Sequence, residues 1–305
     1  QKLQEVMNHT LYSYDITKKV ETREDDSQKL IYSFVAAKRI EGCSEKTIKY
    51  YLTTIENMIN TISKEVRHIQ TDDLRNYLTD YQEKNGSSKI TIDNIRRILS
   101  SFFSWLEDED YIVKSPVRRI HKVKTGTNIK ETYTDEELEI MRDGCPELRD
   151  LAMIDMLAST GMRIGEMVLL NIADIDFTER ECIVFGKGDK ERVVYFDART
   201  KIHLKNYIGS RVDDNPALFV TLKAPFERIK IGGIESRLRS IGKILGIEKV
   251  HPHKFRRTLA TLAIDKGMPI EQLQQLLGHK RIDTTLQYAM VKQSNVKIAH
   301  KKYIG

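Results

Sequence analysis

The sequence predicts a mainly α-helical protein with one small antiparallel β-sheet, built as an N-terminal helical bundle followed by an α+β domain. Three observations predict this class. Apolar residues recur at helical spacing along most of the chain, one stretch near residue 190 alternates like a β-hairpin, and the 305 residues exceed the usual length of one domain. We therefore expect two domains, each with its own core.

Composition argues against several classes of protein. Hydrophobic residues make up 40% of the chain and charged residues 31%, which is typical of a soluble globular protein. No apolar run approaches the roughly 18 residues of a membrane helix, and no signal peptide is evident, so we expect no membrane partner and a cytoplasmic location. Cys43, Cys145 and Cys182 lie far apart, which predicts neither a disulfide framework nor a zinc site.

The N-terminal part reads as an arm followed by four helices. Residues 1–26 mix charges without periodicity, and we assign them no function. Apolar spacing then predicts helices over 27–42, 44–63, 71–86 and 88–112. Their expected N-caps and stops are Ser44, Thr71, Ser88, Gly42 and Gly86. We expect the core of this domain, residues 27–113, to contain Phe102, Phe103, Trp105 and Leu106.

Positive charge is concentrated between the two domains. The net charge is +6, and residues 111–130 contain six Lys or Arg but no Asp or Glu. Such a run is often only a solvated linker, yet a linker that crosses a phosphate backbone has the same composition. We place the interdomain linker at residues 114–130, and the excess charge favours a polyanionic partner.

The second domain, residues 131–305, is predicted to be mostly helical. A capping box of Thr134 and Glu137 opens its first helix, and helical spacing continues over 148–160 and 163–172. Residues 181–196 predict a hairpin, because two β-branched runs flank a Gly-Lys-Gly-Asp turn. Residues 217–222 suggest a short strand. Further helices are expected to begin near Gly233, His253, Pro269 and Asp283, with a last one running toward Ile304.

Six polar residues of this domain lie at predicted turns or element ends. They are Arg163, Lys187, His253, Arg256, His279 and Tyr288. Taken singly, each has a structural explanation, such as an exposed helix start, a solvated hairpin lysine or one face of an amphipathic helix. Together they fit attack on a phosphodiester, which needs a nucleophile, donors for the non-bridging oxygens and a proton source for the leaving alkoxide.

Each residue type suits one part of that reaction. Guanidinium groups match phosphate with a planar fork of donors and stay charged, and a turn lysine can protonate the leaving oxygen. Tyrosine is a poor nucleophile at neutral pH, because a pKa near 10 leaves only about one molecule in a thousand ionised, a deficit of roughly 4 kcal/mol. Nearby cations and a histidine base would offset much of it.

Two other kinds of site are disfavoured. His251 and His253 have H-x-H spacing but no carboxylate or cysteine partner at a plausible position, so we expect no metal. The segment "GKGDKER" lacks the G-x-x-x-x-G-K-[ST] spacing of a phosphate-binding loop, so no ATP is expected. We expect the protein to work without a cofactor.

The order and context of these residues resemble the tyrosine recombinase (phage integrase) family, with a layout like that of the bacterial Xer recombinases. The matching segments are T-G-M-R-I-G-E at 160–166, G-K-G-D-K-E-R at 186–192, H-K-F-R at 253–256, L-L-G-H at 276–279 and Tyr288. The resemblance covers residues 27–305, and the N-terminal bundle is similar to the family's SAM-like core-binding domain. Arg257 departs from the family pattern, which often has histidine there.

The resemblance implies a role for each matched residue. Tyr288 would form a 3′-phosphotyrosyl bond, Arg163, Arg256 and His279 would hold the scissile phosphate, and Lys187 would protonate the 5′-oxygen. His253 would serve as acid-base partner of the tyrosine, and Glu166 would support the pocket from behind. We expect DNA contacts from Lys46, Lys49, Arg96, Arg97, Arg118, Arg119, Lys122, Lys124, Lys190, Arg192 and Arg257.

The resemblance also implies the partners. They are double-stranded DNA with paired inverted-repeat core sites, three further copies of the chain on DNA, and an accessory directionality factor. The free protein is expected to be a monomer, and residues 295–305 are expected to dock on a neighbouring protomer. The reaction would proceed through a Holliday junction and serve integration and excision, inversion or resolution.

Two alternatives to this function stay open at this point. A type IB topoisomerase shares the strand chemistry but needs neither tetramer contacts nor defined sites. A catalytically silent DNA-binding regulator would not need the full set of six catalytic residues.

Overall fold

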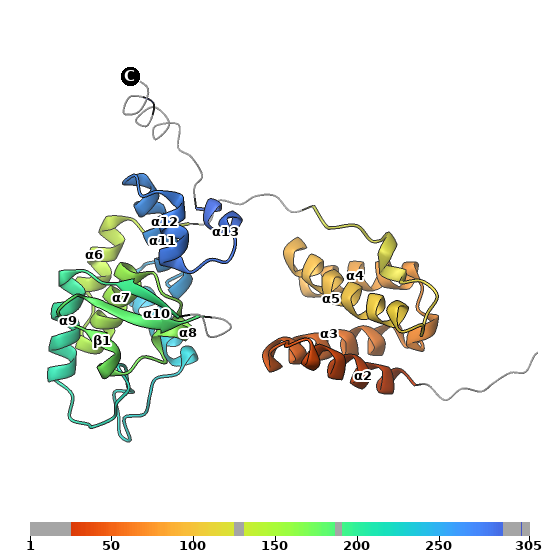
Figure 1. The fold of residues 1–305 in the computed structure, drawn as a ribbon, viewed down its shortest axis with the longest axis horizontal. Helices are drawn as coiled ribbons and strands as arrows, with labels where there is room; N and C mark the ends of the chain where they lie inside the picture. Colours follow the sequence, from red (N-terminus) through yellow and green to blue (C-terminus); the bar gives the residue numbers. More distant parts are fainter. Residues whose placement is uncertain (1–25, 125–130, 187–190, 289–299, 301–305) are drawn as a thin grey trace, which may run out of the picture. The chain divides into compact units, whose positions relative to one another are not determined.

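The computed structural model describes residues 26–124, 131–186, 191–288 and 300. It divides into two compact units, residues 1–128 and 129–305, and each is considered separately (Figure 1). The mainly helical class with one small antiparallel sheet is confirmed. No helix in the described ranges combines the length and the apolar character needed to cross a membrane.

Over the described residues 26–124, the first unit is a four-helix bundle with two single-turn 3₁₀ helices. Its elements are α2 (Ser27–Ile40), α3 (Glu45–Ile62), η1 (Val66–His68), α4 (Thr71–Asn85), α5 (Lys89–Asp108) and η2 (Pro116–Arg119). Phe102, Phe103 and Leu106 are fully buried, as expected, while Trp105 is only partly buried. Phe34 meets Phe102 edge to face at a centroid distance of 5.2 Å, a geometry that aromatic rings favour.

Two details of this unit differ from expectation. The cap of α4 is Gln70, whose backbone N–H donates to the Asp73 carboxylate at 2.9 Å as part of a capping box. The Thr71 hydroxyl instead donates to the carbonyl of Pro116. The first half of the basic segment is also not free chain. It forms η2, and Val117, Ile120 and Val123 pack on the bundle core.

The second unit packs helices around the central helix α7 and a three-stranded sheet. Its helices are α6 (Asp135–Asp143), α7 (Leu148–Thr160), α8 (Ile164–Met167), η3 (Ile172–Asp174), α9 (Ala198–Gly209), α10 (Ile231–Leu245), α11 (Pro252–Asp265), α12 (Ile270–Leu277) and α13 (Ile282–Leu286). The strands β1 (Ile175–Asp176), β2 (Glu181–Phe185) and β3 (Glu191–Tyr195) form an antiparallel sheet in that order.

The predicted hairpin is β2 and β3, with Ile183 opposite Val193. The predicted strand at 217–222 is wrong, since the described chain there makes only isolated bridges, Asn171 with Ala217 and Val220 with Arg228. Helix α9 was missed because its buried residues are few. It is held by its N-cap Asp197, which accepts a hydrogen bond from the Thr200 backbone.

Candidate active site

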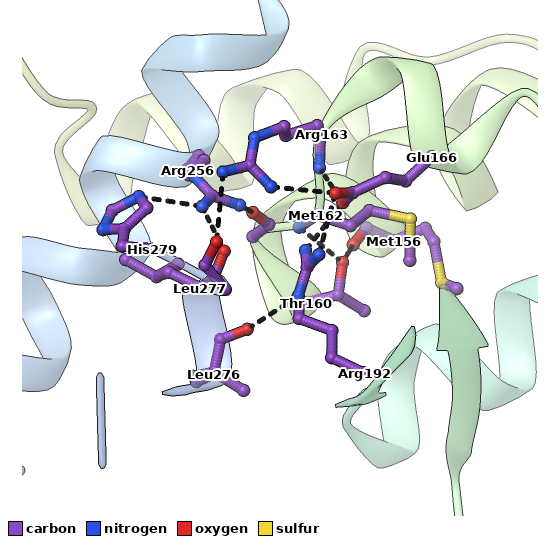
Figure 2. Close-up of polar contacts among 12 residues, drawn as sticks. Met156, Thr160, Met162, Arg163, Glu166, Arg192, Arg256, Leu276, Leu277 and His279 are labelled. Atoms are coloured by element: carbon purple, nitrogen blue, oxygen red, sulfur yellow. Dashed lines mark hydrogen bonds and ion pairs between the residues drawn. The ribbon is translucent and has the colours of Figure 1, made fainter. Parts of the chain in front are cut away.

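Four of the polar residues singled out in the second unit lie on or next to four different helices. Arg163 caps the start of α8, Arg256 lies on α11, His279 follows α12, and Tyr288 follows α13. Arg163, Arg256 and His279 lie together in one cluster (Figure 2). Residues 115 positions apart in sequence are thereby joined, since Arg163 Nη2 donates to the Gly278 carbonyl at 3.4 Å.

Two glycines allow the helix ends to approach this closely. Gly161 ends α7 with φ +58°, and a Cβ there would lie 2.5 Å from a Leu259 methyl group. Gly278 ends α12 with φ +64°, and a Cβ there would lie 2.8 Å from the Arg192 side chain. Any L side chain would be strained in both places, so these positions fix the turns that present Arg163 and His279.

Glu166 anchors one side of the cluster. Its carboxylate, only 5% exposed, accepts hydrogen bonds from Arg163 Nη1 at 2.9 Å and from Arg192 Nη2 at 2.6 Å. Burial opposes its ionisation, but the hydrogen bonds from Arg192 and Arg163 outweigh burial and lower the pKa of Glu166. The carboxylate therefore stays charged and holds both guanidinium groups in place.

Arg256 forms the floor of the cluster. Its side chain is almost completely buried. Nη1 donates to the Gly161 carbonyl at 2.7 Å, and Nη2 donates to the carbonyl of Leu277 and to the ring of His279. Burial, and then the nearby charges of Arg163 and Arg192, lower the pKa of Arg256 to about 10. The group remains protonated at neutral pH, so three guanidinium groups share one small volume, which favours an anion.

His279 is held in one tautomer by its neighbours. Arg256 Nη2 lies 2.9 Å from Nε2, and a guanidinium has no acceptor, so Nε2 must accept. Nδ1 therefore carries the proton and donates to Thr285 Oγ1 at 2.8 Å. Burial, and then the charges of Arg256, Arg163 and Arg192, lower the pKa of His279 to about 4. The ring is neutral at physiological pH.

Tyr288 lies beside His279. The two rings are stacked, with centroids 6.0 Å apart and planes at 25°. The Tyr288 backbone donates to the Thr285 carbonyl at 2.9 Å, and the ring packs against the small cluster of Leu273, Leu277 and Ala260. The tyrosine is thus brought next to the cationic cluster.

His253 lies nearby but outside the hydrogen-bonded network of the described residues. It is exposed on α11, with its ring 6.2 Å from that of His251. Partial desolvation, and then the charges of Arg256, Arg257 and Arg163, lower the pKa of His253. The imidazole is available to accept a proton at neutral pH. Lys187 and Lys190 lie outside the described residues.

Sequence reasoning missed the structural role of Arg192. It was expected to contact DNA, but its guanidinium turns inward to Glu166 and to the Leu276 carbonyl. The alternation of β3 indicates this inward orientation, because Arg192 shares the inner face of the strand with buried Val194. Thr285, fully buried between His279 and Tyr288, was also missed.

The remaining expected DNA contacts lie mostly on surfaces. The exposed ones are Lys46, Lys49, Arg97, Arg118, Arg119, Lys122 and Lys124. Arg96 is largely covered and pairs with Asp93 at 2.8 Å, and Arg118 pairs with Glu107 at 3.3 Å. Arg257 is partly buried, and its Nε has no hydrogen-bond partner among the described residues.

The depressed pKa of His279 predicts a loss of stability in acid. The unfolded chain binds a proton near the ordinary pKa of 6.5, whereas the folded chain does so near 4. Stability is therefore fully present above about pH 6.5 and falls between pH 6.5 and 4, on the order of 2 kcal/mol for this partly exposed ring. His279→Asn should remove most of this change in the free energy of unfolding between pH 6.5 and 4.

Urea denaturation followed by circular dichroism between pH 4 and 7.5 measures this effect. Fluorescence is unsuitable, because the single tryptophan, Trp105, lies in the other unit. Equal pH dependence in the wild type and His279→Asn would contradict the depressed pKa.

Comparison with known proteins gives a consistent pattern. Residues 128–295 match the model of the phage integrase family, and residues 30–112 match that of the phage integrase N-terminal SAM-like domain. The chain is 30% identical over 289 residues to the tyrosine recombinase XerC of Oceanobacillus iheyensis, covering 89% of this chain and 94% of that protein.

Two solved structures are similar over most of the chain. The crystal structure of XerA recombinase is 27% identical, with a TM-score of 0.52 over 92% of this chain and 99% of that one. XerH site-specific recombinase, bound to a palindromic difH substrate after cleavage, is 22% identical, with a TM-score of 0.71 over 92% of this chain and 85% of that one. The latter shows a likeness of fold.

Proposed function

The chain belongs to the phage integrase family and is a site-specific tyrosine recombinase that cleaves and rejoins DNA strands, and from this premise we propose that Tyr288 is its nucleophile. The observation that carries the proposal is the convergence of Arg163, Arg256 and His279 beside the Tyr288 ring. This is a donor-rich, cationic cluster with a hydroxyl-bearing side chain beside it.

The proposed reaction exchanges one phosphoester for another. The Tyr288 oxygen attacks the scissile phosphorus and loses its proton to His253. A 3′-phosphotyrosyl bond forms as the bond to the 5′-oxygen breaks, and that oxygen takes a proton from Lys187 and leaves as a hydroxyl. The reverse attack by a 5′-hydroxyl rejoins the strand, so the bond energy is conserved and no cofactor enters.

The cluster provides what the charged transition state needs. Arg163 and Arg256 present donors to the non-bridging oxygens, and both are pre-oriented by Glu166 and by the Gly161 carbonyl. Arg192 acts indirectly, since its guanidinium holds Glu166 through two hydrogen bonds.

DNA with paired inverted-repeat core sites is the proposed substrate. The exposed lysines and arginines of the first unit support backbone contacts, and the XerH structure on a difH substrate is the related precedent. Binding should weaken steeply with salt. We further propose that four protomers assemble on DNA through the segment at 295–305, that the free chain is monomeric and cytoplasmic, and that an accessory factor sets direction.

A nicked suicide duplex tests the proposal. Cleavage beside the nick releases a short oligonucleotide, so the covalent intermediate accumulates as a band that survives denaturing electrophoresis. We expect this band with DNA carrying inverted repeats from the region that flanks the gene. Its absence with every such DNA would overturn the proposal. Relaxation of a plasmid that carries no such repeats would instead favour a topoisomerase.

Arg256→Lys is expected to lower the single-turnover cleavage rate about 10²- to 10³-fold. Lysine keeps the charge but cannot reach the Gly161 and Leu277 carbonyls while also presenting a planar fork to phosphate. Arg239→Lys is the matched control, because Arg239 is exposed on α10. Equal rates for Arg256→Lys and the wild type would exclude Arg256 from the phosphate clamp.

A further inference from the structure

Thr285 links His279 and Tyr288, the histidine and the tyrosine of the proposed site. Its side chain is fully buried. Its hydroxyl meets His279 Nδ1 at 2.8 Å, and its carbonyl accepts the Tyr288 N–H at 2.9 Å. Among the described residues, His279 is the only hydrogen-bond partner of the Thr285 hydroxyl. Movement of Thr285 would therefore shift both residues together.

The hydrogen bonds of His279 are reversed relative to what a phosphate ligand requires. Here His279 Nε2 accepts from Arg256. To hold a non-bridging oxygen, the nitrogen that faces the phosphate must donate, because that oxygen has no proton to give. The ring is neutral, so one of two things must change when DNA binds. Either the ring gains a second proton, or its single proton moves from Nδ1 to Nε2.

The chemistry of the Nδ1 partner decides whether the single proton of the neutral ring can move. A carboxylate or a backbone carbonyl can only accept, so it would keep the proton on Nδ1 and leave Nε2 an acceptor. A hydroxyl both donates and accepts, and it rotates freely. The Thr285 hydroxyl can therefore form a hydrogen bond with either tautomer of His279 while the ring stays in place.

We propose that Thr285 is a positioning residue whose hydroxyl reverses its hydrogen bond with His279 when the scissile phosphate binds. Nδ1 gives its proton to water, Nε2 takes one from water, and the ring stays neutral. The Thr285 hydroxyl turns to donate to Nδ1. Arg256 Nη2 then no longer donates to His279 Nε2 and donates to the phosphate instead. This inference rests on the proposed function.

Rates and binding of variants test the proposal first. Thr285→Val keeps the shape but removes the hydroxyl, and we expect single-turnover cleavage of the suicide duplex to fall about 10- to 100-fold with DNA affinity unchanged. Thr285→Ser should restore most of the rate. Thr284→Val, a change at the exposed neighbour, is the matched control and should cleave like the wild type.

A spectroscopic measurement tests the tautomer directly, even if Thr285→Val fails to fold. In Tyr288→Phe, which holds the uncleaved complex, ¹⁵N and ¹³C shifts of His279 should report Nδ1–H in the free chain and Nε2–H on the duplex. Nδ1–H in both states, a doubly protonated ring on DNA, or wild-type cleavage by Thr285→Val would each overturn the inference. No covalent complex with the wild-type chain would instead overturn the proposed function.

Discussion

Tyr288→Phe is expected to bind DNA as tightly as the wild type and to form no covalent complex with it. The change removes only the hydroxyl. The ring keeps its place against His279 and the cluster of Leu273 and Leu277, and the hydrogen bond to Thr285 is made by the backbone. Denaturing electrophoresis of the nicked duplex measures the covalent complex, and a gel-shift titration measures binding.

Tyr195→Phe is the control for this experiment. Tyr195 is an exposed tyrosine on β3 and makes no side-chain hydrogen bond among the described residues, so its loss should leave cleavage unchanged. A covalent complex that persists in Tyr288→Phe would mean that another residue attacks the phosphate, and the assignment of Tyr288 would be wrong.

Glu166→Gln is expected to lower the free energy of unfolding by about 3–5 kcal/mol. Glutamine has the same shape but no charge, so Arg192 and Arg163 would lose the anion that compensates them in a buried site. Cleavage should fall as well, because Arg163 would no longer be held toward the phosphate. Urea denaturation followed by circular dichroism measures the stability change.

Glu139→Gln is the matched control for burial. Glu139 also bridges two arginines, Arg142 and Arg199, but its side chain is 54% exposed. Exposed pairs contribute about 0–1 kcal/mol because water competes for them. Equal losses of stability in the two variants would contradict the view that burial makes Glu166 the anchor of the site.

The sequence was most informative where local chemistry decides the structure. The hairpin at residues 181–196 follows from its turn residues and alternating pattern, and the caps at Ser44, Ser88 and Thr134 follow from side chains that reach the helix N–H groups. The catalytic motifs were recognisable because each stands in its own short context. Neighbouring residues carried all of these signals.

Interactions between distant parts of the chain were beyond that kind of reasoning. Thr71 looked like a helix cap, but its hydroxyl donates a hydrogen bond to the carbonyl of Pro116, 45 positions away. Arg192 looked like a DNA contact until the fold placed it against Glu166 and α12. Thr285 gave no signal at all, because its partner His279 lies across a turn whose geometry the sequence does not specify.

The most direct test of the central assignment is to locate the DNA on the protein. The covalent complex formed on the nicked duplex is digested with nuclease and trypsin, and the peptide that carries the residual nucleotide mass is identified by mass spectrometry. We expect the peptide spanning residues 282–292, with the added mass on the Tyr288 oxygen. The same mass on any other residue would contradict it.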